Sequence, residues 1–173
     1  MEVIKTKLEG CFIIKPSVFK DGRGYFMEAY NKKAFEDKTR MAMKFVQDNQ
    51  SFSTYGVIRG LHAQIGAYAQ AKIVRVLEGE VLDVAIDIRP KSRTYLKHIT
   101  AQLSAENEKQ LFLPRGFLHG FAVLSKTATF FYKCDNYYHK ESEIGAFYND
   151  PQFNIDWKIP EQDRIISDKD LNA

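Results

Sequence analysis

The sequence predicts an all-β domain, an antiparallel sandwich or barrel with a few short helices. Most of the chain divides into short runs rich in β-branched and aromatic residues, and turn residues separate them. The run "EVLDVAIDIR" shows the strand period directly, because Leu82, Val84 and Ile86 alternate with Asp83 and Asp87. A length of 173 residues fits one domain, 1–173, with a sizeable core.

The expected elements follow in chain order. A helix is expected over about residues 32–42, with Asn31 as its N-cap. Glu78-Gly79 lies between two apolar runs and predicts a hairpin turn. Strands are expected within 10–19, 24–30, 44–53, 57–62, 71–79, 80–89, 95–104, 109–114, 120–125 and 128–138.

Composition argues against several classes of protein. The net charge is +3, which is weak for a nucleic-acid-binding domain. No apolar run reaches the length of a membrane span, and the N-terminus shows no signal peptide, so we expect a cytoplasmic protein. The two cysteines, Cys11 and Cys134, are far apart in the sequence and predict free thiols rather than a disulfide or a metal site.

One strand carries an irregularity signal. In a regular strand the side chains of Arg59 and His62 would point to opposite faces. Gly60 lies between them, and glycine within a strand often marks a bulge. One extra residue there would bring both side chains to the same face, so we predict a bulge near Gly60.

The stretch "PRGFLHGF" contains Pro-x-Gly-x-x-His, the second half of the cupin barrel signature. Metal-binding cupins also supply His-x-His, whereas "LHAQ" places Gln64 where a second histidine would stand. A His/carboxylate metal site would therefore lack a ligand, and we expect none. Either His62 and His119 are hydrogen-bonded core residues, or they act on a ligand.

Several strands carry polar residues at positions that can face inward. Gln47 and Asn49 share one face of their strand, and Phe26 and Glu28 share one face of theirs. Burying many polar groups without a ligand is costly, which favours a binding site inside the barrel. In "ISDKD", Ser167 and Asp170 have the spacing of a capping box, or else Asp170 orients a histidine.

These segments together resemble the dTDP-4-dehydrorhamnose 3,5-epimerase family of nucleotide-sugar enzymes. The resemblance runs collinearly over nearly the whole chain, through "GRGYFMEAY", "FVQDNQS", "VIRGLHAQ", "PRGFLHGF", "FFYKCDNYY" and "ISDKD". It implies a metal-free cupin-type β-barrel (jelly roll), a homodimer, no cofactor, and a dTDP-linked 4-keto-6-deoxy sugar as substrate. The weak net charge and the lack of a membrane-length apolar run lead us to expect no nucleic-acid or membrane partner.

The resemblance also implies roles for particular residues. His62 matches the general base, Asp170 the carboxylate paired with it, and Tyr132 the proton donor on the opposite face of the sugar. Lys72 matches the cation beside the C4 oxygen. The remaining matches are substrate-binding positions: Arg23, Phe26, Glu28, Gln47, Asp48, Asn49, Arg59, His119, Tyr138, Glu143 and Lys169.

The chemistry of a 4-keto sugar suits these residue types. The C3 and C5 hydrogens lie alpha to the ketone, a neutral imidazole is a suitable base near pH 7, and a lysine ammonium stabilises the enolate. The chain departs from the family at Ala63, Ala71 and Leu118, which leaves sugar fit and inversion at C5 open. The alternatives are a 3-epimerase acting on a related 4-keto sugar and a non-catalytic sugar-nucleotide-binding cupin.

Overall fold

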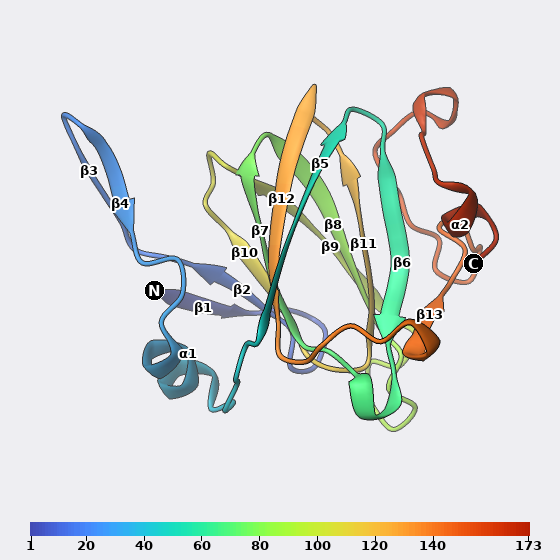
Figure 1. Ribbon diagram of the computed structural model, residues 1–173, viewed down its shortest axis with the longest axis horizontal. Coiled ribbons are helices and arrows are strands. Elements are labelled where there is room, and N and C mark those ends of the chain that lie inside the picture. The colour runs from blue at the N-terminus through green and yellow to red at the C-terminus, as the bar shows by residue number, and fades with distance from the viewer.

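The computed structural model describes residues 1–173 and consists of two facing antiparallel sheets (Figure 1). The all-β class is confirmed, and the architecture is a cupin-type jelly roll. The six-stranded sheet has the order β1-β2-β10-β7-β12-β5, with bounds Glu2–Lys5, Phe12–Lys15, Gln110–Leu113, Lys72–Glu78, Thr127–Cys134 and Gln47–Thr54. The five-stranded sheet has the order β13-β6-β11-β8-β9, with bounds Glu143–Gly145, Ile58–Gln64, Phe117–Val123, Glu80–Asp87 and His98–Ser104.

The helices are few and short, as predicted. They are α1 (Lys32–Thr39) and α2 (Asp168–Leu171), with 3₁₀ turns at Gly66–Tyr68, Lys140–Ser142 and Glu161–Asp163. The side chain of Asn31 accepts a hydrogen bond from the Ala34 N–H, so the N-cap prediction is confirmed. The helix ends at Thr39, short of the expected residue 42, because Arg40 takes the left-handed conformation of a C-cap.

Strand β8 shows why its sequence alternates. Val81 and Ala85 pack into the cluster between the sheets. Leu82, Val84 and Ile86 face the other way and pack against the C-terminal segment, where Trp157 is fully buried. Both faces of the strand are therefore buried, and an acid on the inner face, such as Asp83, lies inside the barrel.

The predicted hairpin at Glu78-Gly79 is wrong. Strand β7 pairs with β10 and β12, whereas β8 pairs with β11 and β9, so Gly79 carries the chain from one sheet to the other. The glycine is needed, since its φ is +78° and an added Cβ would lie 2.0 Å from the Thr127 carbonyl oxygen. The chain does turn at Gly79, but the local sequence does not say which sheet the next strand joins.

The irregularity predicted at Gly60 is present. His62 pairs with His119 and Arg59 pairs with Phe121, so three steps along β6 match two steps along β11. This extra residue is a β-bulge, and the peptide bond from Gly60 to Leu61 is cis. The result is that Arg59 and His62 line the same cavity, as the sequence predicted.

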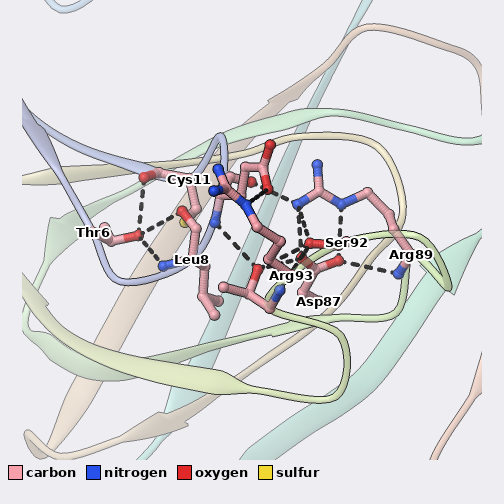
Figure 2. A network of polar contacts seen from close by, with 9 residues as sticks. Thr6, Leu8, Cys11, Asp87, Arg89, Ser92 and Arg93 are labelled. Atoms are coloured by element: carbon pink, nitrogen blue, oxygen red, sulfur yellow. Dashed lines mark hydrogen bonds and ion pairs between the residues drawn. The ribbon is translucent and has the colours of Figure 1, made fainter.

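A polar network joins the loop between β1 and β2 to the segment that follows β8 (Figure 2). The carboxylate of Asp87 accepts hydrogen bonds from Arg89, Ser92 and Thr94. The Arg89 guanidinium also donates to the Glu9 carbonyl, which ties the first loop to the body of the fold. Cys11, in the same network, is a buried free thiol, as is Cys134.

A two-stranded hairpin, β3 (Val18–Asp21) and β4 (Gly24–Met27), projects from the body of the molecule (Figure 1). Its aromatic residues Phe19, Tyr25 and Phe26 are 63%, 57% and 70% exposed. An arm with this much uncovered aromatic surface is typical of a contact with another molecule. No helix of the chain is long and apolar enough to cross a membrane.

Candidate active site

A polar cleft lies between the two sheets. Its inner cavity, of about 290 Å³, is lined from the five-stranded sheet, the six-stranded sheet and α2. An outer cavity of similar size adjoins it, and the two share the side chains of His62, Lys72, Tyr132 and Lys169. The inner lining consists of Gln50, Ser51, Arg59, His62, Lys72, His119, Gly120, Phe121, Phe130, Tyr132, Ser167, Lys169 and Asp170.

His62 pairs with a carboxylate in this cleft. Its Nε2 lies 2.7 Å from Oδ1 of Asp170, which is 4% exposed. The other carboxylate oxygen accepts a hydrogen bond from the Gly60 N–H, so the bulge also holds Asp170. A buried carboxylate on one ring nitrogen sets the tautomer of an imidazole and stabilises its protonated form.

Both interpretations of "ISDKD", the helix cap and the carboxylate that orients a histidine, apply to Asp170. Ser167 caps α2 by accepting a hydrogen bond from the Asp170 N–H, as a capping box requires. The side chain of Asp170 does not return to the cap but bonds His62 and Gly60. The cap therefore orients the first turn of α2 so that Asp170 points into the cleft.

Lys72 and Tyr132 enter from the opposite wall. They lie on the neighbouring strands β7 and β12, and the Lys72 Nζ lies 5.6 Å from the centre of the Tyr132 ring. Burial lowers the pKa of Lys72, although nearby negative charge, including that of Asp83, opposes this. Burial raises the pKa of Tyr132, so its phenol stays protonated well above neutral pH.

A second imidazole–carboxylate pair lies beside the first. The Nε2 of His119 is 2.9 Å from Oδ2 of Asp83, and both side chains are buried. His119 pairs with His62 across β11 and β6, so the two imidazoles occupy adjacent strands on the same face. Arg59 completes this wall and donates from Nε to the Ser53 hydroxyl at 3.0 Å.

The outer cavity gathers most of the other predicted binding residues. Tyr138 donates its hydroxyl to Glu143 at 2.7 Å, and Lys169 forms an ion pair with the same carboxylate. Burial raises the pKa of Glu143, but the bonds from Lys169 and Tyr138 outweigh it and hold the pKa below its ordinary value. Gln47 and Asn49 bond each other at 3.1 Å and line the same cavity.

Four predicted binding residues lie outside this cleft. Asp48 alternates with its neighbours along β5, so it faces outward and pairs with Lys133 at 2.7 Å. Arg23 and Phe26 lie on the projecting hairpin, where Arg23 bonds Asp21. Glu28 follows the hairpin and accepts a hydrogen bond from Asn31. A single copy of the chain does not bring these four side chains to the cleft.

The structure adds cleft residues to which the sequence analysis gave no binding role. Gln64 and Gln70 line the outer cavity, and Ser51 lines the inner one on the same face of β5 as Asn49. The most informative omission is Asp83, which lines neither cavity but pairs with His119, a residue that does. Asp83 stands between the apolar residues Val81 and Ala85 on the inward face of β8, and this was a visible signal because a buried acid needs a partner inside the barrel.

The three departures from the family lie in different places. Leu118 packs in the outer cluster with Trp157, and Ala71 packs against Phe35 and Phe112 on the outside of the six-stranded sheet. Neither residue lines the cleft, which corrects the expectation that both bear on sugar fit. Ala63 does line the outer cavity.

The side chains of the cleft do not form a metal-ligand set. No group of three or more His, Cys, Asp or Glu side chains in the chain is placed to hold a metal ion. The two cleft histidines each direct Nε2 to a carboxylate instead.

Comparison with known proteins identifies the family. The family model described as dTDP-4-dehydrorhamnose 3,5-epimerase matches residues 5–173. The Shigella flexneri enzyme of that name is 51% identical over 100% of this chain and 94% of its own. Crystal structures of the epimerases from Elizabethkingia anophelis and, with dTDP-4-keto-L-rhamnose bound, Legionella pneumophila superimpose with TM-scores of 0.97 and 0.95. The Elizabethkingia protein is 58% identical over 100% of this chain and 94% of its own. The Legionella protein is 46% identical over 99% of this chain and 90% of its own. The chain therefore belongs to the dTDP-4-dehydrorhamnose 3,5-epimerase family of isomerases.

Proposed function

We propose that the cleft residues carry out the family's reaction with His62 as base and Tyr132 as acid. The reaction is epimerisation at C3 and C5 of dTDP-4-keto-6-deoxyglucose to dTDP-4-keto-L-rhamnose, in the synthesis of dTDP-L-rhamnose. The observation that carries this assignment is the His62–Asp170 pair on one wall of the cleft, with Tyr132 and Lys72 on the other. A base on one wall and an acid on the other suit inversion of a sugar carbon, because the proton leaves from one face and a new proton arrives at the opposite face.

Each inversion is a proton transfer through an enolate. His62 takes the proton from the carbon alpha to the C4 ketone, and Asp170 stabilises the imidazolium that forms. Lys72, as an ammonium, stabilises the negative charge that develops on the C4 oxygen. Tyr132 then gives its proton to the opposite face of the carbon, and solvent restores both groups. The ketone itself acidifies the carbon, so these steps need no redox cofactor.

The substrate's nucleotide end is proposed to occupy the outer cavity. Tyr138 is exposed there and offers a ring face on which thymine can stack. Arg59 in the inner cavity and Lys169, which lines both cavities, supply positive charge for the diphosphate where the two cavities meet. Arg59 can bind it through two guanidinium N–H groups. Gln47, Asn49 and Glu143 supply hydrogen-bonding groups at the same mouth.

The protein is proposed to act as a homodimer in the cytoplasm, where nucleoside diphosphate sugars are made. Arg23, Phe26 and Glu28 are expected to contact the nucleotide, yet they lie on or beside an arm that extends away from their own cleft. The outer face of the six-stranded sheet also has unsatisfied buried groups, the Arg75 Nε and Nη1 atoms and the Tyr30 hydroxyl. A second copy that packs on this face would satisfy them and receive the arm.

Mixing two defective variants tests the dimer. His62→Asn removes the base and Arg23→Ala/Phe26→Ala removes the arm contacts, so each variant alone should be nearly inactive. If each arm serves the partner's cleft, equal mixtures should regain about a quarter of wild-type activity, since half the dimers then hold one intact cleft. No recovery after subunit exchange, or a monomer by light scattering, would reject the exchange of arms.

The test of the reaction follows solvent deuterium into dTDP-4-keto-6-deoxyglucose by NMR. Incorporation at C3 and C5 with formation of the L-sugar supports the proposal, and His62→Asn should abolish it while dTDP still binds. Incorporation at C3 alone would favour a 3-epimerase, which Ala63 in the outer cavity keeps as the second candidate. Binding without exchange would indicate a non-catalytic sugar-nucleotide cupin.

A further inference from the structure

We propose that Asp83 is a positioning residue of the cleft. It holds Nε2 of His119 and thereby presents Nδ1 of that imidazole, unprotonated, to a hydroxyl of the substrate sugar. This inference rests on the proposed function for the identity of the ligand, but the contact between Asp83 and His119 stands independently of it. Neither the resemblance nor the comparisons assign Asp83 a role.

Strand register creates the contact. Asp83 pairs with Phe121 and Ala85 pairs with His119 across β8 and β11, so Asp83 and His119 are diagonal neighbours on the inner face. Their side chains meet at 2.9 Å, and Asp83 is fully buried. A carboxylate at this depth needs a donor, and His119 is the donor it has.

The His119 ring is held in two further ways. It stacks on Phe130, with ring centres 6.0 Å apart and planes 24° apart, and Phe130 stacks in turn on Phe121 at 4.1 Å. The aromatic pair sets the plane of the imidazole, and the bond to Asp83 sets its rotation within that plane. Nδ1, which makes no hydrogen bond to the protein, is then the polar atom that His119 offers to the cleft.

The proton between the two residues decides what Nδ1 can do. With the carboxylate ionised, Nε2–H donates to Asp83 and neutral Nδ1 accepts a hydrogen bond, which a sugar hydroxyl can supply. Burial raises the pKa of Asp83 above its ordinary value, and the contact with His119 and the charge of Lys72 offset only part of that rise. The 2.9 Å contact between Nε2 of His119 and Oδ2 of Asp83 is the observation that assigns the proton to Nε2. The pair thus differs in task from His62–Asp170, since His62 serves as the base.

Two substitutions separate positioning from folding. Asp83→Leu removes the acceptor with little change in shape, whereas Asp83→Asn keeps an oxygen that can accept from Nε2–H. The ¹⁵N shifts of His119 report which ring nitrogen carries the proton. Wild type and Asp83→Asn should show N–H at Nε2, and Asp83→Leu should show a mixture of tautomers.

The values of kcat/KM should divide the variants in the same way as the tautomer measurement, with Asp83→Asn close to the wild type and Asp83→Leu below both. We expect Asp83→Leu to lose about tenfold or more in kcat/KM for the keto-sugar nucleotide, and Asp83→Asn to stay within about threefold of wild type. The Kd of dTDP, which has no sugar to position, should be unchanged in both. Asp87→Asn is the control, because Asp87 is a buried acid on the same face of β8 that bonds Arg89 and not a histidine of the cleft.

Three results would overturn the proposal. They are a wild-type His119 protonated at Nδ1, an Asp83→Leu variant with the wild-type tautomer, and an Asp83→Leu variant with wild-type kcat/KM. If the wild type does not epimerise the sugar, the proposed function fails, and the NMR measurement still decides whether Asp83 sets the tautomer of His119.

Discussion

His62 and Asp170 meet at 2.7 Å although 108 residues separate them in the chain. His62 lies on β6 and Asp170 on the short helix at the C-terminus, and the N–H of Gly60 in the bulge donates to the same carboxylate. This imidazole–carboxylate pair therefore depends on how the last helix of the chain docks against one strand of the barrel.

Substituting Asp170 tests this pairing. Asp170→Asn should lower kcat about 10³-fold, because the imidazole loses the charge that stabilises its protonated form. Steady-state kinetics measure the loss, and circular dichroism should show an unchanged fold. Asp168→Asn changes an exposed acid in the same helix and should retain full activity. Equal losses in the two variants would point to the docking of α2 rather than to the carboxylate.

Tyr132 is expected to control the stereochemistry of reprotonation. In Tyr132→Phe, His62 can still remove and return a proton on its own face, so solvent deuterium should enter the sugar with the original configuration. Inversion should fall about 10²-fold or more relative to this exchange. Tyr137→Phe alters an exposed tyrosine nearby and should behave as wild type. Inversion at the wild-type rate in Tyr132→Phe would assign the acid to another group.

The charge of Lys72 predicts the alkaline side of the pH–rate profile. In the proposed mechanism the ammonium is the active form, and burial lowers its pKa. The alkaline decline in kcat should therefore begin at a lower pH than the ordinary lysine pKa of about 10.4 would give. Lys72→Arg keeps its charge at high pH, and its residual activity should decline only at higher pH. Lys126→Arg, at an exposed position, should leave the profile unchanged. If the activity of Lys72→Arg declined at the same alkaline pH as that of the wild type, a group other than Lys72 would cause the decline.

Gly60 should tolerate no side chain. Its φ is +116°, and an added Cβ would lie 2.7 Å from both the Gly120 Cα and the His119 carbonyl oxygen. Gly60→Ala should reduce the free energy of unfolding by about 2–4 kcal/mol and lower activity, because the bulge aligns Arg59 with His62. Urea denaturation measures the change. Gly22→Ala, with open space around it, should alter stability by less than about 0.5 kcal/mol.

The Asp87 network should make stability depend on acid pH. Burial raises the pKa of Asp87, but hydrogen bonds from Arg89, Ser92 and Thr94 outweigh it and hold the pKa far below its ordinary value. A carboxyl whose pKa falls on folding stabilises the protein above its unfolded pKa, and the contribution is lost as the pH falls further.

Asp87→Asn should therefore cost about 1–3 kcal/mol of unfolding free energy at pH 7. The difference from wild type should shrink below about pH 4, where the unfolded carboxyl takes up its proton. Urea denaturation from pH 7 to pH 2 gives this difference. If the difference in unfolding free energy between wild type and Asp87→Asn stayed constant down to pH 2, the charge of the carboxylate would not be what stabilises the network.

Local sequence was enough for the features that depend on neighbours along the chain. Alternation assigned the two faces of β8, Asn31 identified the start of α1, and Gly60 between Arg59 and His62 predicted the bulge. Each follows from backbone geometry over a few residues, which is why each could be predicted. The same alternation places Asp48 on the opposite face from Asn49, and the structure agrees.

Tertiary structure decided what depends on which strands become neighbours. The turn at Gly79 is visible in the sequence, but pairing with β11 and β9 rather than with β7 is what moves β8 into the second sheet. That choice puts Asp83 beside His119, and the docking of α2 puts Asp170 beside His62. A side chain's own segment sets its direction, whereas its partner is set by packing between segments far apart in the chain. The sequence by itself therefore determined the fold class and the chemistry available, and the arrangement of the sheets determined which groups act in pairs.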